Sequence, residues 1–250
     1  EPIGILSSII LPPETEEQDL RRIMSELEQA CDELQIEILG GHTEVSDAVN
    51  RPVITVTGVG KVARGDLLST GGMQPGDELV MTKWAGLEGS AIIAAEKRDV
   101  LEQTLPAHLI DTAESFLKHI SVVPEAKIAM QHGVHAMHDV TEGGIFGALW
   151  EMGAASGVGI VADLDKIPIR QETIELCEVF DINPYLLISS GCMLIGCENG
   201  NLLVERLQEA GIPAAVIGRA TEGNDRVIRS GEETRFLEPA GSDELYKIYE

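Results

Sequence analysis

The stretch Gly71-Gly72-Met73-Gln74-Pro75-Gly76-Asp77 divides the sequence into two parts. Three of its seven residues are glycine and one is proline, which makes it the strongest interruption of regular structure in the chain. A chain of 250 residues is long enough for two domains. We therefore predict one domain over residues 1–72 and a second over residues 73–250.

The part before this stretch has the pattern strand, helix, strand, strand. Residues 3–11 form a near-continuous apolar run that ends at a Pro-Pro pair and predicts a buried strand. Thr15-Glu16-Glu17-Gln18 has the form of a capping box, which predicts Thr15 as the N-cap of a helix. Apolar residues then recur at three- and four-residue steps, as on one face of a helix. Residues 36–39 and 53–59 predict two further strands.

The part after the stretch alternates between strands and helices. Strands are predicted over residues 79–81, 158–162, 193–196 and 214–217. Helices are predicted over residues 87–98, 145–155, 171–179 and 202–209, and residues 100–133 are mostly helical with breaks at two prolines. This alternation indicates an α/β or α+β fold for both parts.

The composition excludes several classes of partner. Eighteen basic and 42 acidic residues give a formal net charge of −24, whereas nucleic-acid backbones and anionic membranes both need a basic surface. No apolar run reaches the roughly 18 residues of a membrane span, so we expect no membrane segment. No basic region precedes an apolar stretch, so we expect no signal peptide. The four cysteines are scattered without a Cys-x-x-Cys pair, which predicts buried thiols in a reducing cytoplasm.

The first candidate site is Gly40-Gly41-His42-Thr43-Glu44, which directly follows the strand predicted over residues 36–39. Two glycines let backbone N–H groups approach an anion, and ligands favour the carboxyl ends of strands. Thr43 supplies a hydroxyl group, while His42 and Glu44 supply a site for a metal ion or a proton. The alternative is a plain Gly-Gly turn whose polar residues face water.

The second candidate site is His138-Asp139-Val140-Thr141-Glu142-Gly143-Gly144, which an apolar helix follows at once. A helix N-terminus preceded by glycines binds anions through its free N–H groups and its dipole. Asp139 and Glu142 offer the carboxylate oxygens that Mg²⁺ prefers beside phosphate. The alternative is that Asp139 or Thr141 only caps the helix.

Other chemical signals in the sequence are weaker. His132, His135 and His138 are spaced by three residues, which admits a zinc site, but Gly133 interrupts the helix that would align them. Ser189-Ser190-Gly191 is typical of a turn into the following strand. No P-loop, dinucleotide fingerprint or nucleophile elbow is present.

Taken in order, these motifs resemble those of the AIR synthase-like superfamily over nearly the whole chain. The superfamily includes AIR synthase, FGAM synthase, thiamine-monophosphate kinase, selenophosphate synthetase and the hydrogenase-maturation protein HypE. Gly40–Glu44 lies where its members carry a similar Gly-Gly motif, and residues 75–80 are similar to the entry of their C-terminal domain. His138–Gly144 is most similar to the HypE-type version of the second motif. The resemblance implies a two-domain AIR synthase-like fold, with mixed sheets covered by helices, that forms a homodimer through its N-terminal domain.

The resemblance also implies chemistry. Members of the superfamily use ATP and Mg²⁺ to activate a small substrate by phosphoryl transfer. Carried over to this sequence, the catalytic residues are Asp139 and His42, and the metal ligands are Asp139, Glu142 and Glu44. The cofactor-binding residues are Gly40, Gly41, Thr43, Thr141, Gly143 and Gly144. The implied partners are a small-molecule substrate, a second copy of the chain and a protein of a maturation pathway, all in the cytoplasm.

Two features depart from the family pattern. The sequence lacks the family's N-terminal glycine-rich segment with its paired aspartates, so we expect a chain truncated at its start. Residues 243–250 carry no cysteine, whereas HypE ends in a cysteine that carries a carbamoyl group. We therefore predict ATP- and Mg²⁺-dependent activation of a small substrate, HypE-like but without the C-terminal cysteine. The alternatives are a small-molecule kinase of the thiamine-phosphate type and a non-catalytic nucleotide-binding or maturation scaffold.

Overall fold

The computed structural model describes residues 1–239 and 241–249. The chain forms two compact units, Glu1–Leu67 and Leu68–Glu250. Residues on both sides of the predicted boundary at 72/73 make hydrogen bonds inside the second unit. Ser69 O accepts the Met137 N–H at 3.2 Å, and Ser156 Oγ accepts the Met73 N–H at 3.2 Å. The segment before the boundary is therefore held by the second unit.

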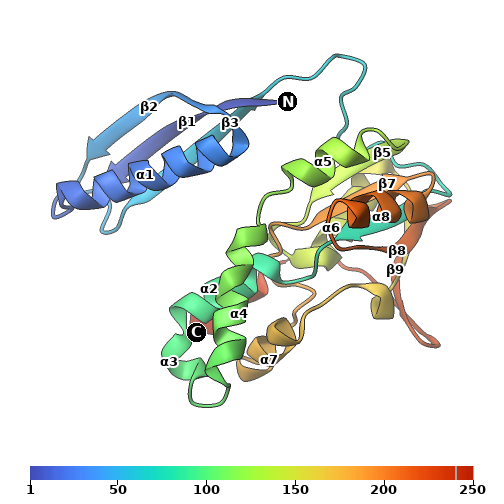
Figure 1. Cartoon of the computed structure of the whole chain (residues 1–250). Coiled ribbons are helices and arrows are strands. Elements are labelled where there is room, and N and C mark those ends of the chain that lie inside the picture. Colours follow the sequence, from blue (N-terminus) through green and yellow to red (C-terminus); the bar gives the residue numbers. More distant parts are fainter. Residues whose placement is uncertain (240, 250) are drawn as a thin grey trace. The chain divides into compact units, whose positions relative to one another are not determined.

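The smaller unit is a three-stranded sheet with one helix. β1 (Pro2–Leu11) is the central strand, parallel to β2 (Glu37–Val45) and antiparallel to β3 (Val53–Gly60). α1 (Glu17–Leu34) connects β1 to β2 and lies along the sheet (Figure 1). A parallel pair needs such a crossover, because the chain must return to the same end of the sheet.

The two faces of this small sheet differ in exposure. Ser7, Ile9 and Leu11 alternate along β1 and are buried, so α1 covers their face. On the other face, Leu6 is 43% exposed and Val53 is 42% exposed. The strand predicted from the apolar run is present, but only one of its faces is buried.

Two local predictions for this unit are wrong. α1 begins at Glu17 and has Glu16 as its N-cap, with no side-chain capping bond. Thr15 instead belongs to the turn after the two prolines, where its N–H donates to Pro12 O at 3.1 Å. The strand predicted to end at residue 39 runs on to Val45, because β1 pairs with it through both glycines and as far as Leu11.

The larger unit contains a seven-stranded mixed sheet in the order β10-β9-β6-β8-β4-β7-β5. Among the described strand pairs of this sheet, only β6 and β9 are parallel. The strands are β4 (Glu78–Thr82), β5 (Val134–Asp139), β6 (Gly159–Asp163), β7 (Met193–Cys197), β8 (Ala214–Thr221), β9 (Arg226–Ser230) and β10 (Glu233–Phe236). The helices are α2 (Leu87–Glu96), α3 (Arg98–Leu101), α4 (Ala107–Glu114), α5 (Val123–Ala129), α6 (Gly144–Ser156), α7 (Gln171–Val179) and α8 (Gly200–Glu209). Three short 3₁₀ helices are η1 (Ser115–His119), η2 (Leu164–Lys166) and η3 (Glu244–Tyr249).

Helices cover both faces of this sheet. Leu79 and Met81 of β4 belong to the main core, which also contains buried residues of α2, α4, α6 and α7. Val80 points to the opposite face and packs in a second core with Leu203 and Leu207 of α8. The alternation of side chains along a strand thus divides the helices into two layers. The predicted α/β class with mixed sheets and helical cover is confirmed.

The structure also tests the predictions about the cysteines and about membrane-spanning helices. All four cysteines are buried and unpaired, as predicted. Burial raises the pKa of the Cys192 thiol to about 12. Among residues 1–239 and 241–249, no helix combines the length and the apolar character that crossing a membrane requires.

Candidate functional site

Asp139 lies at the carboxyl end of a strand that the sequence analysis missed. β5 (Val134–Asp139) is the edge strand beside β7, and it pairs His138 with Leu194 and Asp139 with Met193. The Asp139 side chain is exposed, and it has no ion pair or hydrogen bond with another residue of the described chain. Thr141 is half-buried and Glu142 is exposed in the following turn. This turn therefore offers two free carboxylates and a hydroxyl group.

The start of the following helix, α6, tests the alternative that Asp139 or Thr141 only caps it. The N-cap of α6 is Gly143, and neither Asp139 nor Thr141 caps the helix with its side chain. Gly143 N–H instead donates to Asp243 Oδ2 at 2.7 Å, and Asp243 Oδ1 accepts the Leu245 N–H at 2.8 Å. A buried carboxylate at a helix N-terminus interacts favourably with the free N–H groups and the dipole. The helix N-terminus therefore does hold an anion, and that anion belongs to the chain itself.

Two more backbone N–H groups at the start of α6 are hydrogen-bonded within the chain. Gly144 N–H donates to Thr141 O at 3.1 Å, and Phe146 N–H donates to Tyr185 O at 3.1 Å. Both glycines have positive φ, +77° for Gly143 and +58° for Gly144. Phosphate binding by Gly143 and Gly144 consequently stays a prediction, and it would require these donors to exchange partners.

A hollow of about 400 Å³ opens beside the same helix start. Its lining includes Gly143, Phe146, Asn183 and Arg235. The Arg235 guanidinium lies 5.4 Å from the Phe146 ring centre, in cation–π range, and Tyr185 stacks on that ring at 5.2 Å. This hollow combines a guanidinium group and aromatic surface with one carboxylate, that of Glu238.

The first candidate motif lies in the smaller unit and is part of a strand. Gly41 faces the β1 backbone so closely that an added Cβ would collide with the Ser7 carbonyl oxygen. His42 Nε2 lies 3.4 Å from Glu44 Oε2, and both side chains are exposed on the face opposite α1. Thr43 is directed to the other face by the alternation of the strand. The alternative of a Gly-Gly turn is therefore wrong, and the motif's polar side chains are split between two faces.

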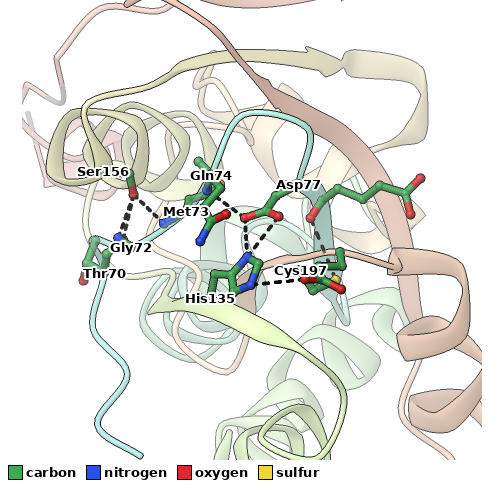
Figure 2. Close-up of polar contacts among 10 residues, drawn as sticks. Thr70, Gly72, Met73, Gln74, Asp77, His135, Ser156 and Cys197 are labelled. Carbon is green, nitrogen blue, oxygen red and sulfur yellow. Dashed lines mark hydrogen bonds and ion pairs between the residues drawn. The ribbon is translucent and has the colours of Figure 1, made fainter. Parts of the chain in front are cut away.

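The three histidines spaced by three residues have separate roles. His135 Nδ1 lies 2.9 Å from Asp77 Oδ2, inside a network that also fixes the glycine-rich stretch (Figure 2). His138 Nε2 lies 2.9 Å from Glu151 Oε2, and His132 Nδ1 lies 2.8 Å from Ile128 O. Within the described chain no three His, Cys, Asp or Glu side chains gather closely enough to hold a metal ion on their own. A zinc site at these histidines is not present.

Asp243 is the residue of this site that sequence reasoning missed. It is separated from Gly143 by 100 residues, and it is 4% exposed. Glu244 is also buried, and its Oε2 accepts the Asn183 N–H at 3.1 Å. No local pattern signals these contacts, because both carboxylates act on backbone groups that are distant in sequence.

Two family models match the chain in sequence. The model of the AIR synthase related protein N-terminal domain matches residues 1–62, and that of the C-terminal domain matches residues 74–230. The chain belongs to the AIR synthase related proteins. A hydrogenase expression/formation protein of Methanocaldococcus jannaschii is 29% identical over 232 residues, which cover 91% of this chain and 67% of that protein. Carbamoyl dehydratase HypE of Rhodobacter capsulatus is 27% identical, covering 91% of this chain and 66% of its own length. The chain thus spans about two thirds of the length of these relatives.

Solved structures share the fold. HypE of E. coli has a TM-score of 0.84 at 20% identity, covering 99% of this chain and 76% of that chain. A HypE in complex with ATP has a TM-score of 0.78 at 18% identity, covering 98% of this chain and 75% of that chain. A thiamine monophosphate kinase complexed with AMPPCP and TMP has a TM-score of 0.69 at 20% identity, covering 93% of this chain and 72% of that chain. The chain is HypE-like within the AIR synthase-like superfamily, as the motifs predicted.

Proposed function

We propose that this protein binds ATP with Mg²⁺ and activates a small substrate by phosphoryl transfer. The observation that carries the proposal is Asp139, a free and exposed carboxylate at the carboxyl end of β5 and directly before a glycine-led helix. The complexes of a HypE with ATP and of a thiamine monophosphate kinase with AMPPCP support nucleotide binding on the same fold.

The donor set of the Asp139 turn fits Mg²⁺. Asp139 and Glu142 are exposed carboxylates, and a protein site with two such groups leaves positions for water and for phosphate oxygens. Bound Mg²⁺ would neutralise charge that develops on the transferred phosphoryl group. Asp139 would hold the ion and orient it, and Thr141 would donate its hydroxyl to a phosphate oxygen. Gly143 and Gly144 would contribute backbone N–H groups once their present acceptors leave.

We propose separate roles for the motif on β2. His42 and Glu44 form an exposed acid–base pair, so His42 would exchange a proton while Glu44 orients its ring or ligates a metal ion. Gly40 and Gly41 would expose backbone groups of the same strand, and Thr43 a hydroxyl. His42→Asn is expected to remove proton transfer while it leaves nucleotide affinity unchanged.

Titration of Mg-ATP by calorimetry tests the central proposal. Asp139→Asn is expected to weaken Mg-ATP binding at least about tenfold, because the variant removes a charged ligand. Glu205→Gln, which removes an exposed carboxylate from α8, is the matched control and should bind as the parent does. Equal binding by parent and Asp139→Asn would refute the metal role of Asp139.

The reaction products distinguish the proposed activity from a small-molecule kinase and from a non-catalytic scaffold. A dehydratase-like or ligase-like reaction releases ADP and phosphate, whereas a small-molecule kinase forms phosphorylated product in proportion to ADP. A scaffold binds without turnover, and its function survives Asp139→Ala. The solved complex of a HypE with HypF supports a protein partner in maturation for this fold.

We also propose that the chain forms a homodimer through the open face of the β2-β1-β3 sheet. Leu6 of the central strand and Val53 of the edge strand β3 are 43% and 42% exposed on this face, so the face presents apolar side chains that nothing in this chain covers within the described residues. Leu6→Glu is expected to yield monomers in sedimentation, while Val45→Glu on the other face should not. The four buried, unpaired cysteines favour a reducing compartment such as the cytoplasm.

A further inference from the structure

A second hollow, of about 550 Å³, lies on the larger unit. Its lining includes Val161 and Asp163 of β6, Arg219 of β8, Arg229 of β9 and Lys166 of η2. Its volume is in the range of small-molecule sites, which run from about 300 to 1,000 Å³. None of Asp139, Thr141 and Glu142 lies among its lining residues.

The strand register explains why the two arginines share this hollow. Val161 pairs with Arg219 on one side, and Asp163 pairs with Arg229 on the other. Val161 and Asp163 are two residues apart, so all four side chains lie on one face of the sheet. Ile160 and Ala162 point to the opposite face, where they are buried in the main core with α6. The hollow is therefore on the side of the sheet away from α6.

Arg219 and Arg229 differ from every other arginine of this unit in lacking a partner. Arg98 and Arg206 form ion pairs, while Arg170, Arg226 and Arg235 lie over aromatic rings. Arg219 and Arg229 are exposed and have neither kind of partner within the described chain. In a chain with 42 acidic and 18 basic residues, two unpaired arginines in one hollow require an explanation.

None of the carboxylates of the hollow forms an ion pair with Arg219 or Arg229 within the described chain, and two of the three bond to other groups. Asp163 Oδ2 accepts from Lys166 Nζ at 2.8 Å. Glu78 Oε2 accepts the Gly200 N–H at 2.7 Å and so caps α8. Glu198 Oε1 lies 3.7 Å from His135 Nε2. The guanidinium groups of Arg219 and Arg229 remain free to bind a ligand.

We propose that this hollow is a second ligand site, which binds a small, multiply charged oxyanion such as a phosphate ester through Arg219 and Arg229. A guanidinium group presents a planar fork of donors that matches phosphate and carboxylate oxygens. Two such forks, on the two strands that flank β6 and on one face of the sheet, would hold the ligand from two directions. The site is independent of the proposed ATP chemistry at Asp139.

Calorimetry on the full chain tests this site without nucleotide or Mg²⁺. The probes are pyrophosphate and citrate at low ionic strength, which separate phosphate from carboxylate recognition and limit screening. Saturable binding of at least one probe is expected. Arg219→Gln and Arg229→Gln should each weaken it about tenfold or more, since each removes charged hydrogen bonds. Arg206→Gln, which removes an arginine paired with Glu209 at 2.8 Å, should leave it within about twofold of the parent.

The calorimetric results that would overturn this proposal differ from those that would overturn the proposed ATP site. No saturable binding of either probe overturns the proposal, and so does an equal loss in the Arg206→Gln control. Undiminished binding by Arg219→Gln and Arg229→Gln also overturns it. Asp139→Asn should bind the probes as the parent does, so failure of this site and failure of the proposed ATP site are read separately. An unchanged unfolding midpoint confirms that the exposed substitutions leave the fold intact.

Discussion

Gly144, at the start of α6, has a backbone environment that allows no side chain. We predict that Gly144→Ala destabilises the larger unit strongly. An added Cβ would lie 2.6 Å from Tyr185 O and 2.7 Å from Leu187 O. Both atoms are backbone, so neither can move aside as the end of a flexible side chain could. The φ of Gly144 is also positive, at +58°.

Gly157 at the other end of the same helix is the matched control. Its φ is +67°, and nothing lies within 4 Å of an added Cβ. Both alanine variants incur the left-handed backbone cost of about 1–2 kcal/mol. Both also gain the same entropy term from a stiffer unfolded chain, about 0.4–1 kcal/mol, which cancels in the comparison. Only Gly144→Ala adds the overpacking cost of about 1–3 kcal/mol.

Urea unfolding followed by tryptophan fluorescence measures the difference. Trp84 and Trp150 are the two tryptophans of the chain, and both belong to the larger unit, so the signal reports that unit alone. Gly144→Ala should lose about 1–3 kcal/mol more unfolding free energy than Gly157→Ala. Equal losses would refute the steric argument. A stable Gly144→Ala protein that loses Mg-ATP binding would instead assign this glycine to ligand approach.

Further predictions concern a buried ion pair, two buried thiols and the dependence of ATP binding on Mg²⁺. Lys83→Met is expected to cost about 3–5 kcal/mol in unfolding free energy, because it leaves Glu125 buried without the cation that lies 2.5 Å away. Adding Glu125→Leu should restore part of this loss in the same unfolding assay, because three backbone carbonyl oxygens still lack the Lys83 donor. Burial raises the pKa of Cys177 and Cys192 to about 12 from the ordinary 9.0, so these thiols should resist a disulfide reagent at neutral pH and react after denaturation. Because the unfolded thiols ionise first, unfolding free energy should fall as pH rises from 9.0 to about 12 and should not depend on these groups below that window. Removal of Mg²⁺ with EDTA should weaken ATP binding, and titration with and without the ion measures the effect.

Several helices were predictable from the sequence, and α7 has the best-matched bounds. Its predicted range of residues 171–179 matches the helix Gln171–Val179. β5 was missed because its six residues include two histidines and an aspartate, which do not read as a strand. Pairing with β7 nevertheless keeps it extended, with Ala136 buried against the core. Here tertiary contacts override a weak local pattern.

The glycines of the first motif were predicted as points where the backbone approaches an anion, with a plain turn as the alternative. Gly41 lies inside β2, where it permits close approach of the Ser7 backbone of β1, so the alternative of a turn is wrong. Gly143 does begin a helix, as its sequence context predicted. The group that meets its N–H could not be predicted, because Asp243 lies 100 residues away and has no periodic or spacing signal.

Asp139 and Asp243 flank the same helix start, and their different surroundings predict different phenotypes. Asp243 is 4% exposed and bonded to two backbone N–H groups, so Asp243→Ala should cost about 1–3 kcal/mol by leaving a buried donor unpaired. The Asp139 side chain is exposed and makes no hydrogen bond or ion pair within the described chain, so Asp139→Asn should leave the unfolding free energy within about 0.5 kcal/mol of the parent. If ATP chemistry depends on this turn, Asp139→Asn loses Mg-ATP affinity at unchanged stability. A variant that lost stability and affinity together would show instead that Asp139 supports the fold.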